Sequence, residues 1–145
     1  MDFGYLFTST EGRINRAKWW VGMIVLAVVN IVLSWVLLSI LGTHAPIALL
    51  VLQLVLFYPG YAVGAKRFQD RDRPGMFALI LPALGLLSQL ATTLGLSGDP
   101  TAPGALSYIF MILILAVAIW YLIDLGILKG TTGPNPYGPD PLAVR

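Results

Sequence analysis

Two aspartates stand one residue apart near the middle of the chain, in a stretch rich in arginine. Asp70 and Asp72 form a D-x-D pair, and two carboxylates at this spacing can hold Mg²⁺ or Mn²⁺ against the phosphates of a substrate. Arg71 and Arg73 alternate with them and would neutralise their charge. We therefore favour an ion-paired loop without a metal site, and keep an Asp-dependent lipid-modifying enzyme as the less favoured interpretation.

A third aspartate, Asp124, lies inside a long apolar stretch, about one helical turn from its end. A carboxylate at membrane depth is costly unless it is paired or hydrated, which makes Asp124 a candidate for function. The structural interpretation is a salt bridge to Arg67, Lys66 or Arg13, and the alternative is coupling to a proton or an ion.

Other kinds of chemistry find no support in the residue types. The chain has no cysteine and a single histidine, His44, so it lacks the residues for thiolate sites, a histidine metal cluster or a Ser-His-Asp triad in the membrane. No P-loop or G-x-S-x-G motif is present. The sequence therefore predicts no catalytic residues, no metal and no cofactor, and a net charge of +2 is too small to suggest nucleic acid.

The composition is that of a membrane protein. Hydrophobic residues make up 57% of the chain and charged residues 11%, against about 25% charged residues in ordinary soluble domains. A helix needs about 20 mostly apolar residues to cross a bilayer. Four stretches meet this length, at residues 19–41, 47–65, 76–96 and 105–128. They predict an all-α bundle of four transmembrane helices with short loops, formed as a single membrane domain over residues 1–145.

The positive charges orient these helices. Every Lys and Arg lies before the first stretch, in the central connector 66–75 or in the tail 129–145, and the connectors 42–46 and 97–104 have none. Connectors rich in Lys and Arg stay in the cytoplasm. Both termini and the central connector are therefore expected in the cytoplasm.

Seven basic residues would gather beneath the helices in this topology. Each such charge contributes about 1 kcal/mol of attraction to an anionic leaflet, so together they would bind acidic lipid headgroups. The alternative is that they only fix the orientation of the chain. The residues of this expected basic collar are Arg13, Arg16, Lys18, Lys66, Arg67, Arg71 and Arg73.

Small and neutral polar residues in the apolar stretches predict contacts between helices. Gly60 and Gly64 form a G-x-x-x-G motif, which allows close packing within the bundle or, less favoured, in a dimer. Interhelical hydrogen bonds would satisfy the neutral polar side chains. These are Asn30, Ser34, Gln53, Gln89, Thr92 and Thr93.

The tail after the last stretch is rich in proline and glycine, which excludes a helix. We expect it to fold back beneath the bundle with Tyr137 as its anchor. The alternative is a docking ligand for a partner, since Pro136 and Pro139 have P-x-x-P spacing.

Three separated segments resemble a known family. They read G-R-I-N-R before two tryptophans, K-R-F-Q-D followed by R-P-G, and G-T-T-G-P-N-P-Y-G-P-D-P at residues 130–141. In this order they are similar to the domain-of-unknown-function 805 family of small bacterial inner-membrane proteins. The resemblance implies a bacterial inner-membrane location and four spans, and the family has no assigned activity.

The chain departs from the family pattern at two places. Gln69 stands where the family usually has histidine, and Met76 and Phe77 stand where it has an aromatic pair. If that histidine is a ligand or proton carrier in relatives, this chain lacks it. The departure weakens metal and proton-transfer hypotheses here.

The favoured hypothesis is a non-enzymatic inner-membrane protein whose cytoplasmic face binds anionic phospholipid or a protein partner. The alternative is a homo-oligomeric small transporter or channel subunit. The candidate residues of the cytoplasmic face come from all three motif segments and the end of the last span. They are Arg13, Arg16, Trp20, Lys66, Arg67, Asp70, Arg73, Asp124, Asn135 and Tyr137.

Overall fold

The computed structural model describes residues 1–99 and 101–143. Helices dominate this part of the chain, and its only sheet is a hairpin of two strands with two residues each. The elements are α1 (Phe3–Thr8), α2 (Arg16–Leu41), η1 (Gly42–His44), α3 (Ala45–Asp70), η2 (Gly75–Leu79), α4 (Ile80–Thr93), β1 (Gly98–Asp99), β2 (Ala102–Pro103), α5 (Ala105–Tyr121) and the π-helical η3 (Leu122–Ile127).

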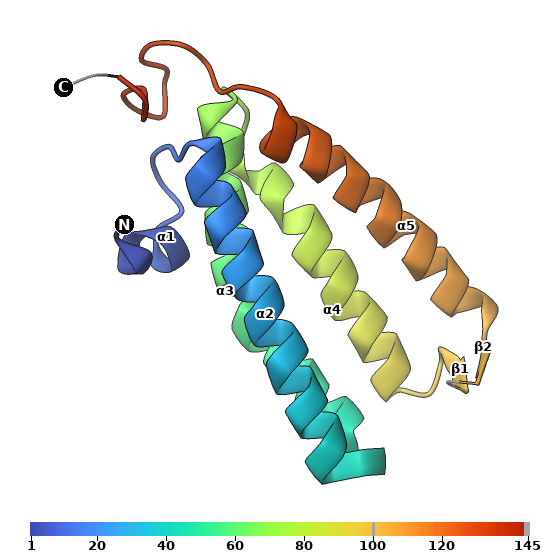
Figure 1. Cartoon of the computed structure of the whole chain (residues 1–145). Coiled ribbons are helices and arrows are strands. Elements are labelled where there is room, and N and C mark those ends of the chain that lie inside the picture. Colours follow the sequence, from blue (N-terminus) through green and yellow to red (C-terminus); the bar gives the residue numbers. More distant parts are fainter. Residues whose placement is uncertain (100, 144–145) are drawn as a thin grey trace.

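Three continuous helical stretches among the described residues are long and apolar enough to span a membrane. They are Arg16–Asp70, Gly75–Thr93 and Ala105–Ile127. The first has 55 residues, and η1 reverses it so that α2 and α3 run antiparallel (Figure 1). The chain is therefore a helical membrane protein.

The start of α2 follows from a side-chain cap. The Asn15 side-chain oxygen accepts a hydrogen bond from the Lys18 backbone N–H at 2.9 Å, which satisfies one of the free donors in the first turn. The helix therefore begins at Arg16, three residues before the apolar stretch.

The end of α3 corrects the sequence prediction. A loop was expected from Lys66, but α3 continues through Lys66 and Arg67 to Asp70 with Pro59 inside it. These charged side chains are buried by the N-terminal segment and the tail, so charge at these positions does not indicate a solvent-exposed loop. The expected connector is thus reduced to the residues between Asp70 and Gly75.

The connector 97–104 forms the hairpin β1–β2, in which Gly98 pairs with Pro103 and Asp99 with Ala102. It lies at the far end of the bundle from the chain termini (Figure 1). Among the described residues, the all-α expectation is corrected by these two strands of two residues each.

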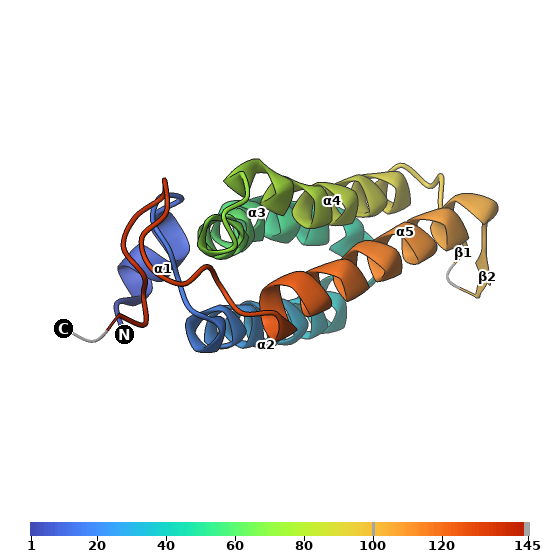
Figure 2. The same cartoon turned by 90° about the horizontal axis from the view of Figure 1, so that it is seen from above.

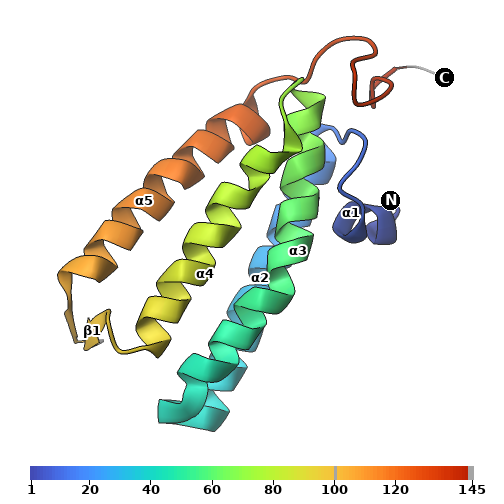
Figure 3. The ribbon, with the colours of Figure 1, turned by 180° about the vertical axis from the view of Figure 1, so that it is seen from behind.

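The buried core lies at one end of the bundle. α3 packs against α2, α4, η2 and α1, while α5 packs against α4 and its continuation η3 against α2. Figure 3 shows α1 beside α3, close to both ends of the chain. The buried core cluster is Leu6, Ile14, Trp19, Val63, Ala65, Phe68, Ala78, Tyr121 and Leu125.

Candidate functional site

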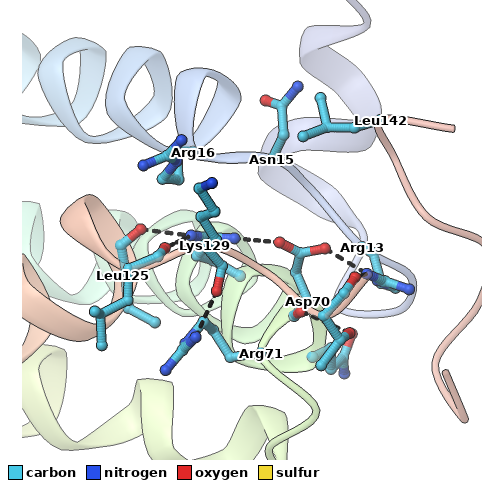
Figure 4. Close-up of polar contacts among 12 residues, drawn as sticks. Arg13, Asn15, Arg16, Asp70, Arg71, Leu125, Lys129 and Leu142 are labelled. Carbon is cyan, nitrogen blue, oxygen red and sulfur yellow. Dashed lines mark hydrogen bonds and ion pairs between the residues drawn. The ribbon is translucent and has the colours of Figure 1, made fainter. Parts of the chain in front are cut away.

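We call the region formed by residues 2–16, 66–73 and 122–143 the charged end. At its centre, Asp70 accepts hydrogen bonds from two arginines of different segments (Figure 4). The Arg13 Nε donates to one carboxylate oxygen at 3.0 Å, and an Arg67 NH group donates to the other. All three side chains are at most 3% exposed. Two buried cations therefore share this one carboxylate, and both of its oxygens accept hydrogen bonds.

Arg13 also binds the tail. Its terminal nitrogens donate to the carbonyl oxygens of Thr131 at 2.6 Å, Gly133 at 2.7 Å and Gly138 at 3.2 Å. One side chain thus connects the N-terminal segment, the end of α3 and the tail. Arg has the fork of donors that such a multiple contact needs.

Arg67 binds the end of the last helical stretch. Its Nε donates to the Leu125 carbonyl at 2.8 Å and another nitrogen donates to the Leu128 carbonyl at 2.6 Å. Carbonyls in the last turn of a helix have no intrahelical donor and carry partial negative charge, so a cation here stabilises the helix end.

Lys66 is directed to α1 instead of the membrane surface. Its Nζ donates to the carbonyl oxygens of Tyr5 and Leu6, each at 2.9 Å, and to that of Ser9. The ammonium also lies 4.9 Å from the centre of the Tyr5 ring, within the range of a cation–π contact. Burial raises the pKa of the Tyr5 hydroxyl. Lys66 therefore caps the C-terminal end of α1, and its charge is not available to a lipid headgroup.

Asp124 pairs with partners that the sequence analysis did not name. Its carboxylate accepts from Arg71 at 3.1 Å and from Arg73 at 2.9 Å. The expected pairing with Arg13, Lys66 or Arg67 is wrong, because these side chains bind Asp70 and backbone carbonyls.

The D-x-D pair does not form a joint site. Asp70 is buried in its two ion pairs, while Asp72 is exposed and has a left-handed backbone with φ 58°. Arg71 and Arg73 neutralise Asp124 and not Asp70, contrary to the expectation from their alternation. No group of three His, Cys, Asp or Glu side chains that could hold a metal occurs within residues 1–99 and 101–143.

The tail lies against the end of α3 through Asn135 and Thr131. The Asn135 Nδ2 donates to the Gln69 carbonyl at 2.8 Å, and the Thr131 backbone N–H donates to the Asp70 carbonyl at 2.8 Å. Tyr137, the expected anchor, is half-buried, and its ring lines a small pocket that Gln69 also borders. The folded-back tail is thus held mainly by hydrogen bonds from residues other than Tyr137.

The Gln69 side chain bridges to the N-terminal segment. Its Nε2 donates to the Thr10 carbonyl at 3.0 Å, while its buried Oε1 has no hydrogen-bond partner among the described residues.

Gly130 of the tail packs closely against Asp70, since a Cβ at residue 130 would lie 2.0 Å from the Asp70 Oδ2. The candidate residues did not include Thr131, whose backbone N–H and hydroxyl both donate to the Asp70 carbonyl and whose hydroxyl accepts from Asn135.

A polar recess of about 330 Å³ lies between the start of α2 and the tail. Arg16, Lys129 and the N-cap Asn15 border it, and Arg67 and Asp70 also line it (Figure 4). The Asp140 carboxylate lines it too and accepts from the backbone N–H groups of Leu142 at 2.9 Å and Gly133 at 3.0 Å. These bonds hold the pKa of Asp140 below its ordinary value. Lys129 is a site residue that the candidate list lacked.

The remaining candidate residues lie in the helices. Trp20 is 40% exposed and its Nε1 donates to the Gly126 carbonyl at 3.3 Å, which joins α2 to η3. A Cβ at Gly64 would lie 2.8 Å from the Ala78 Cβ, whereas one at Gly60 would have no neighbour within 4 Å. The close approach in the G-x-x-x-G motif is therefore made at Gly64, to η2.

Comparison with known proteins places this chain in a family. A model of the family described as "Protein of unknown function (DUF805)" matches residues 7–139. Inner membrane protein YhaI of Escherichia coli K12 is 31% identical over 97 residues, which cover 64% of this chain and 81% of that protein. The uncharacterized protein YiiR of the same strain is 30% identical over 146 aligned residues, covering 94% of this chain and 88% of that protein. No solved structure matches the chain.

Neither the family description nor these relatives carries the name of an enzyme. The matched range includes the two arginines around Asp70 and the tail as far as residue 139. The chain belongs to the DUF805 family and is an integral membrane protein of unknown activity.

Proposed function

We propose that the chain crosses the bacterial inner membrane four times, with the charged end in the cytoplasm. α2 and α3 have 26 residues each, more than the about 20 that a crossing needs. The stretches Gly75–Thr93 and Ala105–Ile127 have 19 and 23 residues. The complete segregation of Lys and Arg supports this direction, and the inner-membrane relative supports the location.

Labelling of single cysteines tests this topology, because the chain has none of its own. Thr101→Cys in the β1–β2 hairpin and Thr132→Cys in the tail both replace exposed residues. A membrane-impermeant maleimide added to intact spheroplasts should label Thr101→Cys only, and Thr132→Cys only after lysis. Labelling of both positions from outside, or the reverse pattern, would contradict the topology.

We further infer that the charged end binds the headgroup of an anionic phospholipid and performs no catalysis. Most of the expected collar is not available, since Arg13, Lys66 and Arg67 are buried and engaged within the protein. Arg71 and Arg73 share Asp124. Headgroup binding therefore rests on the remaining exposed cations.

The supporting observation is the pair Arg16 and Lys129 at the polar recess. Both are exposed and neither has an ion pair among the described residues, because Asp70 is held by two arginines and Asp140 by backbone N–H groups. Arg16 donates only to the Ile127 carbonyl, at 2.9 Å. It opens helix α2, whose positive end adds attraction for a phosphate.

Native mass spectrometry from nanodiscs tests this proposal, with equal amounts of phosphatidylglycerol and phosphatidylcholine. Arg16→Gln combined with Lys129→Gln should reduce the preference for phosphatidylglycerol about thirtyfold, since each cation contributes about 1 kcal/mol. Lys18→Gln is the matched control: Lys18 is exposed and does not line the recess. Lys18→Gln should reduce the preference by less than about twofold, because an exposed charge outside the recess attracts the headgroup only diffusely and is screened by salt.

If Lys18→Gln reduced the preference for phosphatidylglycerol as much per replaced residue as the Arg16/Lys129 variant does, no defined headgroup site would exist. The same spectra address the alternatives named from the sequence. A protein that co-purifies with the wild type and is lost in the Arg16/Lys129 variant would replace the lipid by a protein partner. A stable dimer or higher oligomer that carries no bound phosphatidylglycerol would favour the transporter or channel interpretation.

A further inference from the structure

A cavity lies between the four long helices and shares no lining residue with the charged recess. Its volume is about 580 Å³, within the range of about 300–1,000 Å³ typical of small-molecule sites. Residues of α2, α3, α4 and α5 line it, and most of them are apolar, such as Leu26, Leu56, Leu81 and Ile114. No Lys, Arg, His, Asp or Glu of the described residues borders it.

Two side-chain amides border this apolar cavity. Asn30 of α2 and Gln53 of α3 are half-buried, and neither side chain makes a hydrogen bond within the described residues. The interhelical hydrogen bonds expected for these two residues are therefore absent there, whereas Gln89 does donate to the Pro46 carbonyl, at 3.3 Å. An amide without a partner is costly in an apolar medium. The cavity thus offers hydrogen bonds that the protein itself does not use.

A second hollow adjoins the cavity on the side of α2 and α5. This hollow of about 370 Å³ shares Met23 and Ala118 with the cavity and reaches Ile24 and Leu122 on the outer surface. Those two side chains are 56% and 42% exposed. Figure 2 shows the bundle from above, with α2 and α5 on the side opposite α3 and α4. In a bilayer this side faces acyl chains, so a ligand would enter from the lipid phase.

We propose that this cavity binds an uncharged, lipid-soluble molecule whose carbonyl or hydroxyl group hydrogen-bonds to Asn30 and Gln53. The apolar lining and the adjoining hollow select for lipid solubility. The absence of charged lining residues among those described selects against an ionised ligand, and the two free amides select for a neutral polar group. This site is separate from the headgroup recess and does not depend on it.

Two sets of variants isolate these features. Asn30→Leu combined with Gln53→Leu removes both amides, and leucine is more favourable than either amide in a transmembrane helix. Ala118→Leu fills the cavity from α5, and Ala116→Leu, on an exposed position of the same helix, is its matched control. Gly60→Leu fills the cavity from α3, where no atom lies within 4 Å of a new Cβ.

The experiment measures binding of three probes to the full chain in nanodiscs by native mass spectrometry: dioctanoylglycerol, its phosphorylated anionic analogue and dodecane. Dioctanoylglycerol should bind saturably and more tightly than the other two. The Asn30/Gln53 variant should weaken this binding about tenfold, as expected for two hydrogen bonds in a membrane, and leave dodecane unchanged. Ala118→Leu and Gly60→Leu should weaken it about five- to a hundredfold, and Ala116→Leu should not.

Equal binding of dioctanoylglycerol by the wild type and the Asn30/Gln53 variant would overturn the proposal. A dimer that the same variant dissociates would also overturn it, since a second copy would then occupy the cavity. Arg16→Gln with Lys129→Gln should leave dioctanoylglycerol binding intact. The two sites can therefore fail independently.

Discussion

The charged end and the middle of the bundle are stabilised by different interactions. At the charged end, Asp70 is shared by Arg13 and Arg67, and these residues bind segments more than 50 positions apart in sequence. In the middle, apolar side chains such as Val28 and Ile31 remain 54% and 66% exposed. The middle also contains the large cavity.

The bilayer explains this difference. Apolar side chains gain little by leaving acyl chains for another helix, so packing in the middle can stay loose. Buried ion pairs bind only in one geometry, and loss of one partner is expensive. The charged end thus fixes how the helices meet, while the middle retains space that a ligand can occupy.

The largest expected effect is at Asp70. Asp70→Asn would leave two buried guanidinium groups without a counter-charge, and should lower the free energy of unfolding by about 3–5 kcal/mol. Titration with SDS in mixed micelles measures this change through the loss of helicity.

Asp72→Asn is the control, two residues further along the chain. Asp72 is exposed with a left-handed φ of 58°, a conformation that Asn tolerates. We expect a change within about 0.5 kcal/mol. Equal destabilisation by both variants would mean that the central ion pairs do not hold the charged end together.

A second comparison uses two glycines of α3, one turn apart. Gly64→Ala forces a methyl to 2.8 Å from the Ala78 Cβ and should destabilise by about 1–3 kcal/mol. Gly60→Ala enters open space and should stabilise by up to about 1 kcal/mol through helix propensity. The same SDS titration measures both. Similar losses at both positions would indicate that the middle of the bundle is packed as tightly as its charged end.

Much of the helical framework could be predicted from sequence because long apolar stretches and an N-cap are local signals. Asn15 before Arg16 and the apolar stretch after it locate the start of α2. The continuation of α3 to Asp70 was missed for a physical reason: Lys66 and Arg67 indicate a surface loop unless their buried partners are known. Apart from Asp70, which pairs with Arg67, those partners are backbone carbonyls, which any residue type supplies.

The ion pairs of the charged end could not be predicted from the sequence. Asp124 was expected to pair with Arg67, Lys66 or Arg13, but its partners are Arg71 and Arg73. Opposite charges identify possible partners, and only the tertiary arrangement decides among them. Lys129 was missed because a lone lysine after an apolar stretch is also the ordinary signal for topology.

A smaller effect is expected at the second shared aspartate. Asp124→Asn removes the counter-charge of Arg71 and Arg73, whose side chains are 21% and 43% exposed and can turn to solvent. The free energy of unfolding should fall by about 1 kcal/mol, since solvent screens ion pairs with partly exposed side chains. SDS titration beside Asp70→Asn measures the difference. A loss as large as that of Asp70→Asn would place both aspartates in one buried network.

The smallest effect is a local response of the tail to acid. The backbone N–H groups of Leu142 and Gly133 donate to the Asp140 carboxylate and hold its pKa below the ordinary value of about 3.9. A lowered folded pKa means that the carboxylate stabilises the tail fully above the ordinary value, and that this contribution is lost as the pH falls through the lower folded value. The amide proton shifts of Gly133 and Leu142 should therefore move together in this acidic range. Asp140→Asn should abolish this pH-dependent change in the two amide shifts. If the change persists in the variant, the acid response belongs to another group of the charged end.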